Sequence, residues 1–72
     1  MIPILSQNRE AIILPAIIEL DSNSRSILGF NTTGHFSLLL GSYDSPKRCG
    51  EIISTYVAAV ENGQPIFIMP EI

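Results

Sequence analysis

The chain has 72 residues, a net charge of −3 and a calculated isoelectric point near 4.8. This length predicts one small domain, residues 1–72. The acidic balance excludes a protein that binds phosphate backbones through its overall charge, although a local basic patch remains open. The single cysteine, Cys49, excludes an intrachain disulfide and a thiolate zinc cluster.

Apolar residues are in surplus. They make up 46% of the chain and charged residues 15%, against about 25% charged in average proteins. One helix and one small sheet can bury only part of this apolar surface. We therefore expect self-association, in the simplest case as a homodimer. The longest apolar run, residues 11–18, is too short for a membrane helix, and no basic run precedes an apolar core. We therefore expect a cytoplasmic protein without a signal peptide or membrane contact.

The first half of the chain predicts five short strands. They cover residues 2–5, 10–14, 16–20, 25–31 and 35–40. In the turn at 6–9, Asn8 is the residue most tolerant of a left-handed backbone. Pro15 favours a bend or bulge between the second and third strands. Alternatively, residues 12–14 and 16–18 form one long bent strand, which leaves four strands.

The fifth predicted strand alternates in side-chain type. Phe36, Leu38 and Leu40 share one face, while His35, Ser37 and Leu39 share the other. Such alternation favours an antiparallel meander with one buried face.

A helix follows over residues 46–62. Ser45 is a suitable N-cap, Pro46 suits the first helical position, and Gly63 suits the left-handed residue after the end. One wide apolar face is expected to pack on the sheet. Its members are Cys49, Ile52, Ile53, Tyr56, Val57, Ala59 and Val60.

The order of elements predicts an α+β fold. A curved antiparallel sheet of four to five short strands is packed by one C-terminal amphipathic helix. Residues 65–69 form a short last strand or an extended tail. Sheet edges at residues 2–5 and 66–69 are candidates for adding a partner strand.

The joint between the fifth strand and the helix is predicted to set how the helix begins. Gly41 lets the chain turn sharply as it leaves the strand. Tyr43 buries its ring while its hydroxyl finds a partner. Arg48 either stacks on Tyr43 or pairs with a carboxylate, Asp44 or Glu51. A functional alternative is that Lys47 and Arg48, together with helix amides, bind an anion at the helix start.

This joint also carries a family resemblance. The run Leu40-Gly41-Ser42-Tyr43-Asp44-Ser45, followed by Arg48, Glu51, Ile52 and Ile53, resembles a pattern in small uncharacterised Gram-positive bacterial proteins, some from phage or other mobile regions. Residues 4–8 and 67–71 resemble both ends of those proteins. The resemblance implies fold and size and no catalytic residue. Two positions depart from the pattern: Cys49 stands where alanine is usual, and Arg9 where glycine is common.

Other candidates for chemistry are weak. His35, the single histidine, is interpreted as an exposed residue at a strand end, and Cys49 as a core residue. The polar run 21–24 lacks the later ligands of a calcium loop, and no cofactor motif occurs.

Two functions follow from these observations. The first is a small non-enzymatic interaction or structural protein that self-associates and binds a protein partner of unknown identity. The alternative is a nucleic-acid-associated accessory factor, which needs Arg9, Arg25, Lys47 and Arg48 on one surface.

Overall fold

Two three-stranded sheets and one helix build the protein, in a computed structural model that describes residues 1–31 and 36–71. The strands are β1 (Ile4–Leu5), β2 (Ile12–Ile13), β3 (Ile17–Asp21), β4 (Ser26–Phe30), β5 (Ser37–Ser42) and β6 (Phe67–Ile68), and the helix is α1 (Pro46–Glu61). The α+β class is confirmed. In the described part of the chain, no helix has the length and apolar character needed to cross a membrane.

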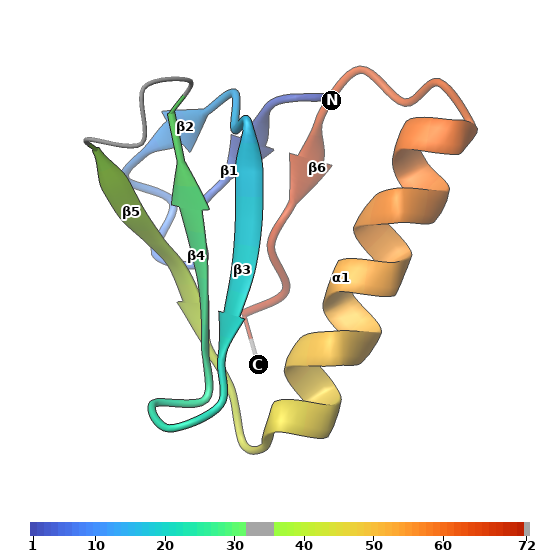
Figure 1. Ribbon diagram of the computed structural model, residues 1–72. Helices are drawn as coiled ribbons and strands as arrows, with labels where there is room; N and C mark the ends of the chain where they lie inside the picture. Colours follow the sequence, from blue (N-terminus) through green and yellow to red (C-terminus); the bar gives the residue numbers. More distant parts are fainter. Residues whose placement is uncertain (32–35, 72) are drawn as a thin grey trace.

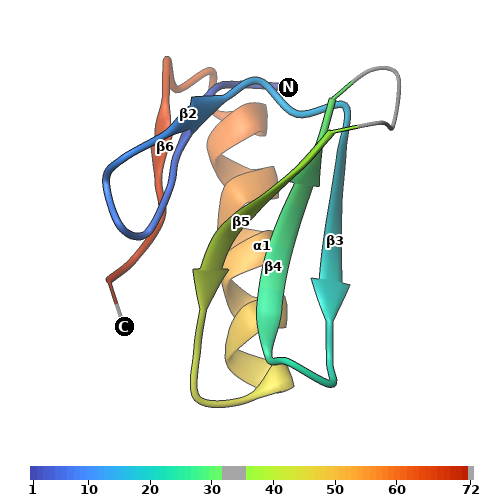
Figure 2. The same cartoon turned by 90° about the vertical axis from the view of Figure 1, so that its left-hand side faces the viewer.

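Both sheets lie on the same side of α1 (Figure 1). Figure 2 shows them next to each other, with the helix behind β4 and β5. The strand order is β3-β4-β5 in one sheet and β2-β1-β6 in the other. The predicted curved sheet is therefore a curved layer made of two short sheets. Its concave face packs on the helix, as expected.

The last strand pairs with the first. β6 lies parallel to β1, with Ile4 opposite Phe67. The amide of Phe67 donates to the carbonyl of Pro3 at 2.9 Å, and the amide of Met69 to that of Leu5 at 3.0 Å. β1 is thus the central strand of its sheet, so the prediction of an exposed edge at residues 2–5 is wrong. Residues 65–69 do contain the predicted short strand, which is a sheet edge.

Pro15 separates two strands that belong to different sheets. β2 ends before it and pairs with β1, whereas β3 begins after it and pairs with β4. Pro15 itself is buried. The arrangement with one long bent strand is therefore excluded. The reason is that the chain changes sheets within three residues, and a proline restricts the residue before it to extended backbone.

β3, β4 and β5 form the predicted antiparallel meander, with one irregularity. The register shifts between Ile27 and Leu28, because Ile27 pairs with Gly41 and Leu28 with Leu39. Leu40 is thereby the extra residue of a bulge, and it is 1% exposed. Leu38 and Leu40 both pack on the core as expected. Phe36 does not, since it precedes the start of β5 and is 52% exposed.

The helix begins at the predicted residue and ends at Glu61, one residue before the predicted end. The Ser45 hydroxyl accepts a hydrogen bond from the Arg48 amide at 3.2 Å, and Pro46 occupies the first helical turn. Asn62 is the C-cap, and Gly63 adopts a φ of 70°. A positive φ of this kind is readily accessible to glycine, which has no Cβ.

The buried helix face is narrower than predicted. Val57 is 50% exposed, since it lies at the margin of the predicted arc. Tyr56 and Phe67 meet edge to face, with ring centroids 5.4 Å apart. The Tyr56 hydroxyl also donates to the carbonyl of Ile2 at 2.8 Å and thereby anchors the N-terminal strand. The core consists of Ile4, Ile27, Leu40, Tyr43, Cys49, Ile52, Tyr56, Ala59, Phe67 and Met69.

Truncation of the helix face tests this core. Ile52 is 2% exposed and Val57 is 50% exposed. We expect Ile52→Ala to lower the free energy of unfolding by about 2–5 kcal/mol, because it leaves a cavity, and Val57→Ala to change it by less than about 1 kcal/mol. Urea titration followed by circular dichroism measures both. Equal losses in the two variants would show that α1 packs on the sheets through a different face.

Candidate functional site

Gly41 is required by a close contact and not by a turn. It lies inside β5, and its φ is not positive, which corrects the predicted sharp turn. A Cβ placed on Gly41 would lie 2.7 Å from the hydroxyl oxygen of Tyr43 and 2.8 Å from its Cε2. The Tyr43 ring folds back over the strand at this point, so only glycine leaves room for it.

Tyr43 is buried, as predicted, and its hydroxyl has a partner. The side chain is 7% exposed and donates to the carbonyl of Pro70 at 2.7 Å. Burial raises the pKa of the Tyr43 phenol, and the neighbouring Cys49 adds to this, while Arg48 and Arg9 oppose it. The phenol therefore stays protonated through neutral pH and remains a hydrogen-bond donor to Pro70.

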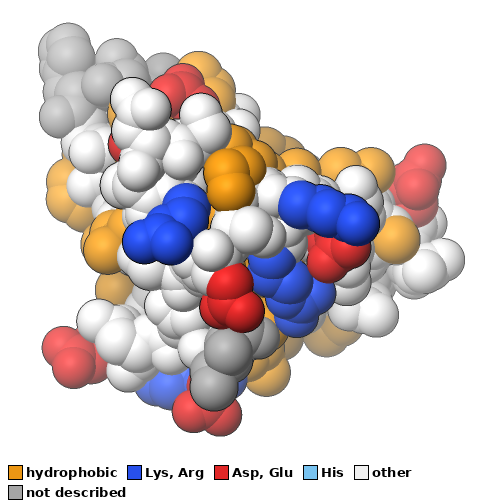
Figure 3. All heavy atoms as spheres, turned by 90° about the horizontal axis from the view of Figure 1, so that it is seen from below, with side chains coloured by type: hydrophobic (Ala, Val, Ile, Leu, Met, Phe, Trp, Pro, Cys, Tyr) orange, Lys and Arg blue, Asp and Glu red, His pale blue; other side chains and the backbone are white. Residues whose placement is uncertain are grey.

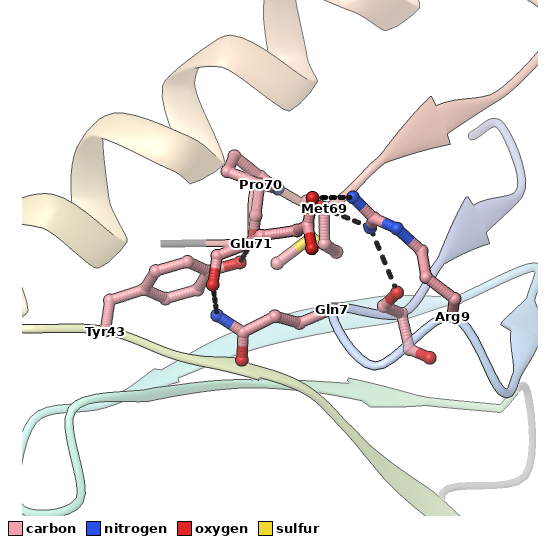
Figure 4. Close-up of polar contacts among 7 residues, drawn as sticks. Gln7, Arg9, Tyr43, Met69, Pro70 and Glu71 are labelled. Atoms are coloured by element: carbon pink, nitrogen blue, oxygen red, sulfur yellow. Dashed lines mark hydrogen bonds and ion pairs between the residues drawn. The ribbon is translucent and has the colours of Figure 1, made fainter.

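Three side chains hold residues 69–71 against the sheets (Figure 4). Arg9 Nη1 donates to the carbonyl of Met69 at 2.6 Å, Tyr43 to that of Pro70 at 2.7 Å, and Gln7 Nε2 to that of Glu71 at 2.7 Å. Three successive carbonyls are thus bound by side chains that are far from them in the sequence. We call this group the tail clamp; it consists of Gln7, Arg9, Tyr43 and residues 69–71.

Gln7 also joins the two sheets. Its Oε1 accepts from the Ser42 amide at 2.9 Å, and its Nε2 donates to the Ser42 carbonyl at 2.9 Å. The side-chain amide therefore pairs with both backbone groups of Ser42, as a neighbouring strand would. Its own backbone amide donates to the Leu40 carbonyl at 2.7 Å. The open edge of β5 is closed at this end by one residue that follows β1.

Arg9, and not Asn8, adopts the left-handed backbone in the first turn. Its φ is 67°, whereas Asn8 uses its side chain to accept hydrogen bonds from Ser6 Oγ at 2.7 Å and the Glu10 amide at 3.0 Å. Such a φ costs a non-glycine residue about 1 kcal/mol or more. The contact of Arg9 with Met69 and a 3.8 Å ion pair with Glu71 offset this cost. This is the position at which the resembled pattern commonly has glycine.

Basic side chains gather at the end of the molecule where α1 begins, with acidic side chains among them (Figure 3). Lys47 and Arg48 lie in the first helical turn, and Arg25 Nη1 reaches the carbonyl of Asp44 at 3.4 Å. Arg48 forms the predicted ion pair with Glu51, at 3.7 Å. Anion binding by Lys47 and Arg48 remains a prediction.

The remaining candidates for chemistry lie in the core or outside the described residues. Cys49 is fully buried, and burial raises the pKa of its thiol, which makes it a weak nucleophile. His35 lies outside the described residues. Within residues 1–31 and 36–71, no three His, Cys, Asp or Glu side chains are grouped as metal ligands would be.

Four apolar side chains lie on the face of the β3-β4-β5 sheet that points away from the helix, with Glu19 beside them, opposite Leu28. Ile17 lies opposite Phe30, and Leu28 lies opposite Leu39, so all four share one face. Ile17 and Leu39 are each 54% exposed. We call Ile17, Leu28, Phe30 and Leu39 the outer apolar surface. The alternation predicted that Leu39 lies on the face opposite Leu38 and Leu40, but the sequence did not indicate which residues of β3 and β4 share this face.

Comparison with models of known protein families, with curated proteins and with solved structures gives no match. The family resemblance seen in the sequence therefore stays a prediction. Its three stretches nevertheless meet in space, because Gln7 from the first contacts Ser42 from the second and Glu71 from the third. These stretches therefore act together in holding the C-terminal residues against the sheets.

A pair of glycine substitutions tests the Tyr43 contact. We expect Gly41→Ala to lower the free energy of unfolding by about 1–3 kcal/mol, because the new methyl group displaces the Tyr43 ring. A methyl group added to Gly50 in α1 would meet nothing within 4 Å beyond the neighbouring helix backbone, so Gly50→Ala is expected to stabilise the protein by up to about 1 kcal/mol. Thermal unfolding of both variants measures the difference. A Gly41→Ala protein as stable as the wild type would contradict the close contact.

A second substitution tests the join made by Gln7. In Gln7→Glu, a carboxylate replaces the Nε2 donor and faces the carbonyls of Ser42 and Glu71. We expect a loss of about 1–3 kcal/mol at pH 7. These carbonyls raise the pKa of the new carboxyl in the folded state, so the deficit relative to wild type shrinks as the pH falls and the group is protonated. A deficit that does not depend on pH between 7 and 4 would refute the proposed pairing.

Proposed function

We propose that this chain is a small non-enzymatic interaction protein that self-associates through the outer apolar surface. One observation carries the proposal: Ile17 and Leu39 are each more than half exposed, and they flank Phe30 and Leu28 on the same sheet face. Contiguous apolar patches on a small protein commonly mark interaction sites. A second copy is the simplest partner, because the same apolar surface on both subunits is self-complementary under two-fold symmetry.

A further apolar row supports the same proposal. Ile12, Leu5 and Ile68 lie directly across from one another on β2, β1 and β6, and Ile12 and Ile68 are 65% and 53% exposed. Their neighbours Ile13, Ile4 and Phe67 face the core. Both sheets thus present apolar side chains away from α1. The proposal includes a cytoplasmic location.

Mass measurements on matched variants test self-association. We expect the wild type to be a dimer at micromolar concentration by sedimentation equilibrium. Leu39→Lys places a charge in the outer apolar surface and should weaken the dimer at least tenfold, equivalent to about 1.4 kcal/mol. Val57→Lys is the control, because Val57 is 50% exposed but lies on the helix. A monomeric wild type, or equal effects of the two variants, would overturn the proposal.

The alternative is a nucleic-acid-associated accessory factor. It is supported by the gathering of basic side chains near the start of α1 (Figure 3). It is weakened by the net charge of −3 and by the engagement of Arg9 with Glu71 and Arg48 with Glu51. A gel-shift assay at low salt separates the two functions, since phosphate contacts are strongest there. Unretarded DNA and RNA at tens of micromolar protein would exclude the alternative.

A further inference from the structure

β3 has a free edge. It ends the β3-β4-β5 sheet and pairs with β4 on one side only. Figure 2 shows β3 at the border of the layer, and no strand of the described residues, 1–31 and 36–71, lies beyond it. Backbone amides and carbonyls along such an edge form a template for an additional strand.

The other sheet edges in the described part of the chain are less suited to pairing. β2 and β6 have two residues each, whereas β3 has five. The edge of β5 is engaged by Gln7, which pairs with both backbone groups of Ser42. β3 also contains no proline, which would lack a backbone donor for pairing. The preceding proline, Pro15, lies before the start of the strand. β3 is therefore the longest open edge.

The side chains of β3 disfavour pairing between this strand and the same strand of a second copy. In antiparallel self-pairing over residues 17–21, Glu19 lies directly opposite its own counterpart, and Ile17 lies opposite Asp21. Like charges opposed in this way are destabilising, and an apolar residue gains nothing from a carboxylate. Glu19 is exposed and has no ion pair with any residue in 1–31 or 36–71. Its charge is thus available to a basic side chain.

The residues on the other face of β3 determine which further side chains a partner strand would need. Ile18 and Leu20 alternate with the acidic positions and pack against the core while remaining partly exposed. A strand added beside β3 would place alternate side chains next to these two residues, and apolar groups fit there. Its intervening side chains would face Glu19 and Asp21. The edge therefore matches a strand in which apolar and basic residues alternate.

We propose that β3 binds an extended segment of a partner protein by strand addition, with lysine or arginine facing Glu19 and Asp21 and apolar residues facing Ile18 and Leu20. This site adjoins the outer apolar surface, because Glu19 lies on the same sheet face as Ile17 and directly opposite Leu28. It differs from that surface in using the backbone edge of β3.

Synthetic peptides test the proposal. The probe is a nine-residue peptide of alternating valine and lysine, and its counterpart has glutamate in place of lysine. We expect the lysine peptide to bind the wild-type protein and to shift the backbone amide NMR signals of Ile17–Asp21, and the glutamate peptide not to bind. A lysine peptide with alternate amides N-methylated lacks the donors along one edge and should bind at least tenfold more weakly.

Charge reversal provides the matched comparison. Glu19→Lys should lower affinity for the lysine peptide at least tenfold and give measurable binding of the glutamate peptide. Glu61→Lys changes the net charge equally, but at the exposed end of α1, and should leave both affinities within twofold of wild type. The proposal is overturned if the lysine peptide does not bind at millimolar concentration. It is also overturned if the shifts map away from β3, if N-methylation has no effect, or if the two charge variants behave alike.

Discussion

The fold depends on how two short sheets are held together beside a single helix. A chain of 72 residues buries only about 60% of its unfolded surface, so neither sheet is stable alone. Gln7 joins them, because its side chain supplies the hydrogen bonds that a neighbouring strand would supply to Ser42. Without this join, the backbone groups of Ser42 would face solvent, and the concave layer over α1 would open.

The tail clamp extends this constraint to the C-terminal residues. β6 contributes only two residues to its sheet, and its parallel pairing with β1 is short. The hydrogen bonds to the carbonyls of residues 69–71 compensate for this brevity. The requirement for glycine at position 41 has the same origin, since the Tyr43 ring needs that space to reach Pro70. The hydrogen bonds of the tail clamp and the glycine at position 41 thus both serve to hold the C-terminal residues against the sheets.

The sequence predicted the features that depend on near neighbours. Ser45, Pro46 and Gly63 marked the helix ends, because caps act within one turn. The parallel pairing of β1 with β6 was not predicted, since more than 60 residues separate Ile4 from Phe67 and two-residue strands carry no periodicity. Gln7 was missed for a related reason. An ordinary polar residue in a turn shows no sign of a partner 35 residues away.

The same limit applies to the candidate interaction surfaces. Composition indicated the apolar surplus, and alternation placed Leu39 on the face opposite Leu38. The register that sets Leu39 beside Leu28 depends on strand pairing, which the sequence does not reveal. The left-handed φ of Arg9 is explained only by its contacts with Met69 and Glu71. These positions are fixed by tertiary neighbours, so local pattern carries little information about them.

The two proposed surfaces meet at β3, and their chemistry differs. The side chains of the outer apolar surface are uncharged and therefore compatible with an identical copy. The β3 edge carries Glu19 at its centre, which disfavours pairing with itself and favours a basic strand. A dimer formed face to face through Leu39 and Phe30 would leave the backbone edge of β3 unpaired. Glu19 lies on the face that such a dimer covers, opposite Leu28, so a second copy and a basic strand would compete for its surroundings.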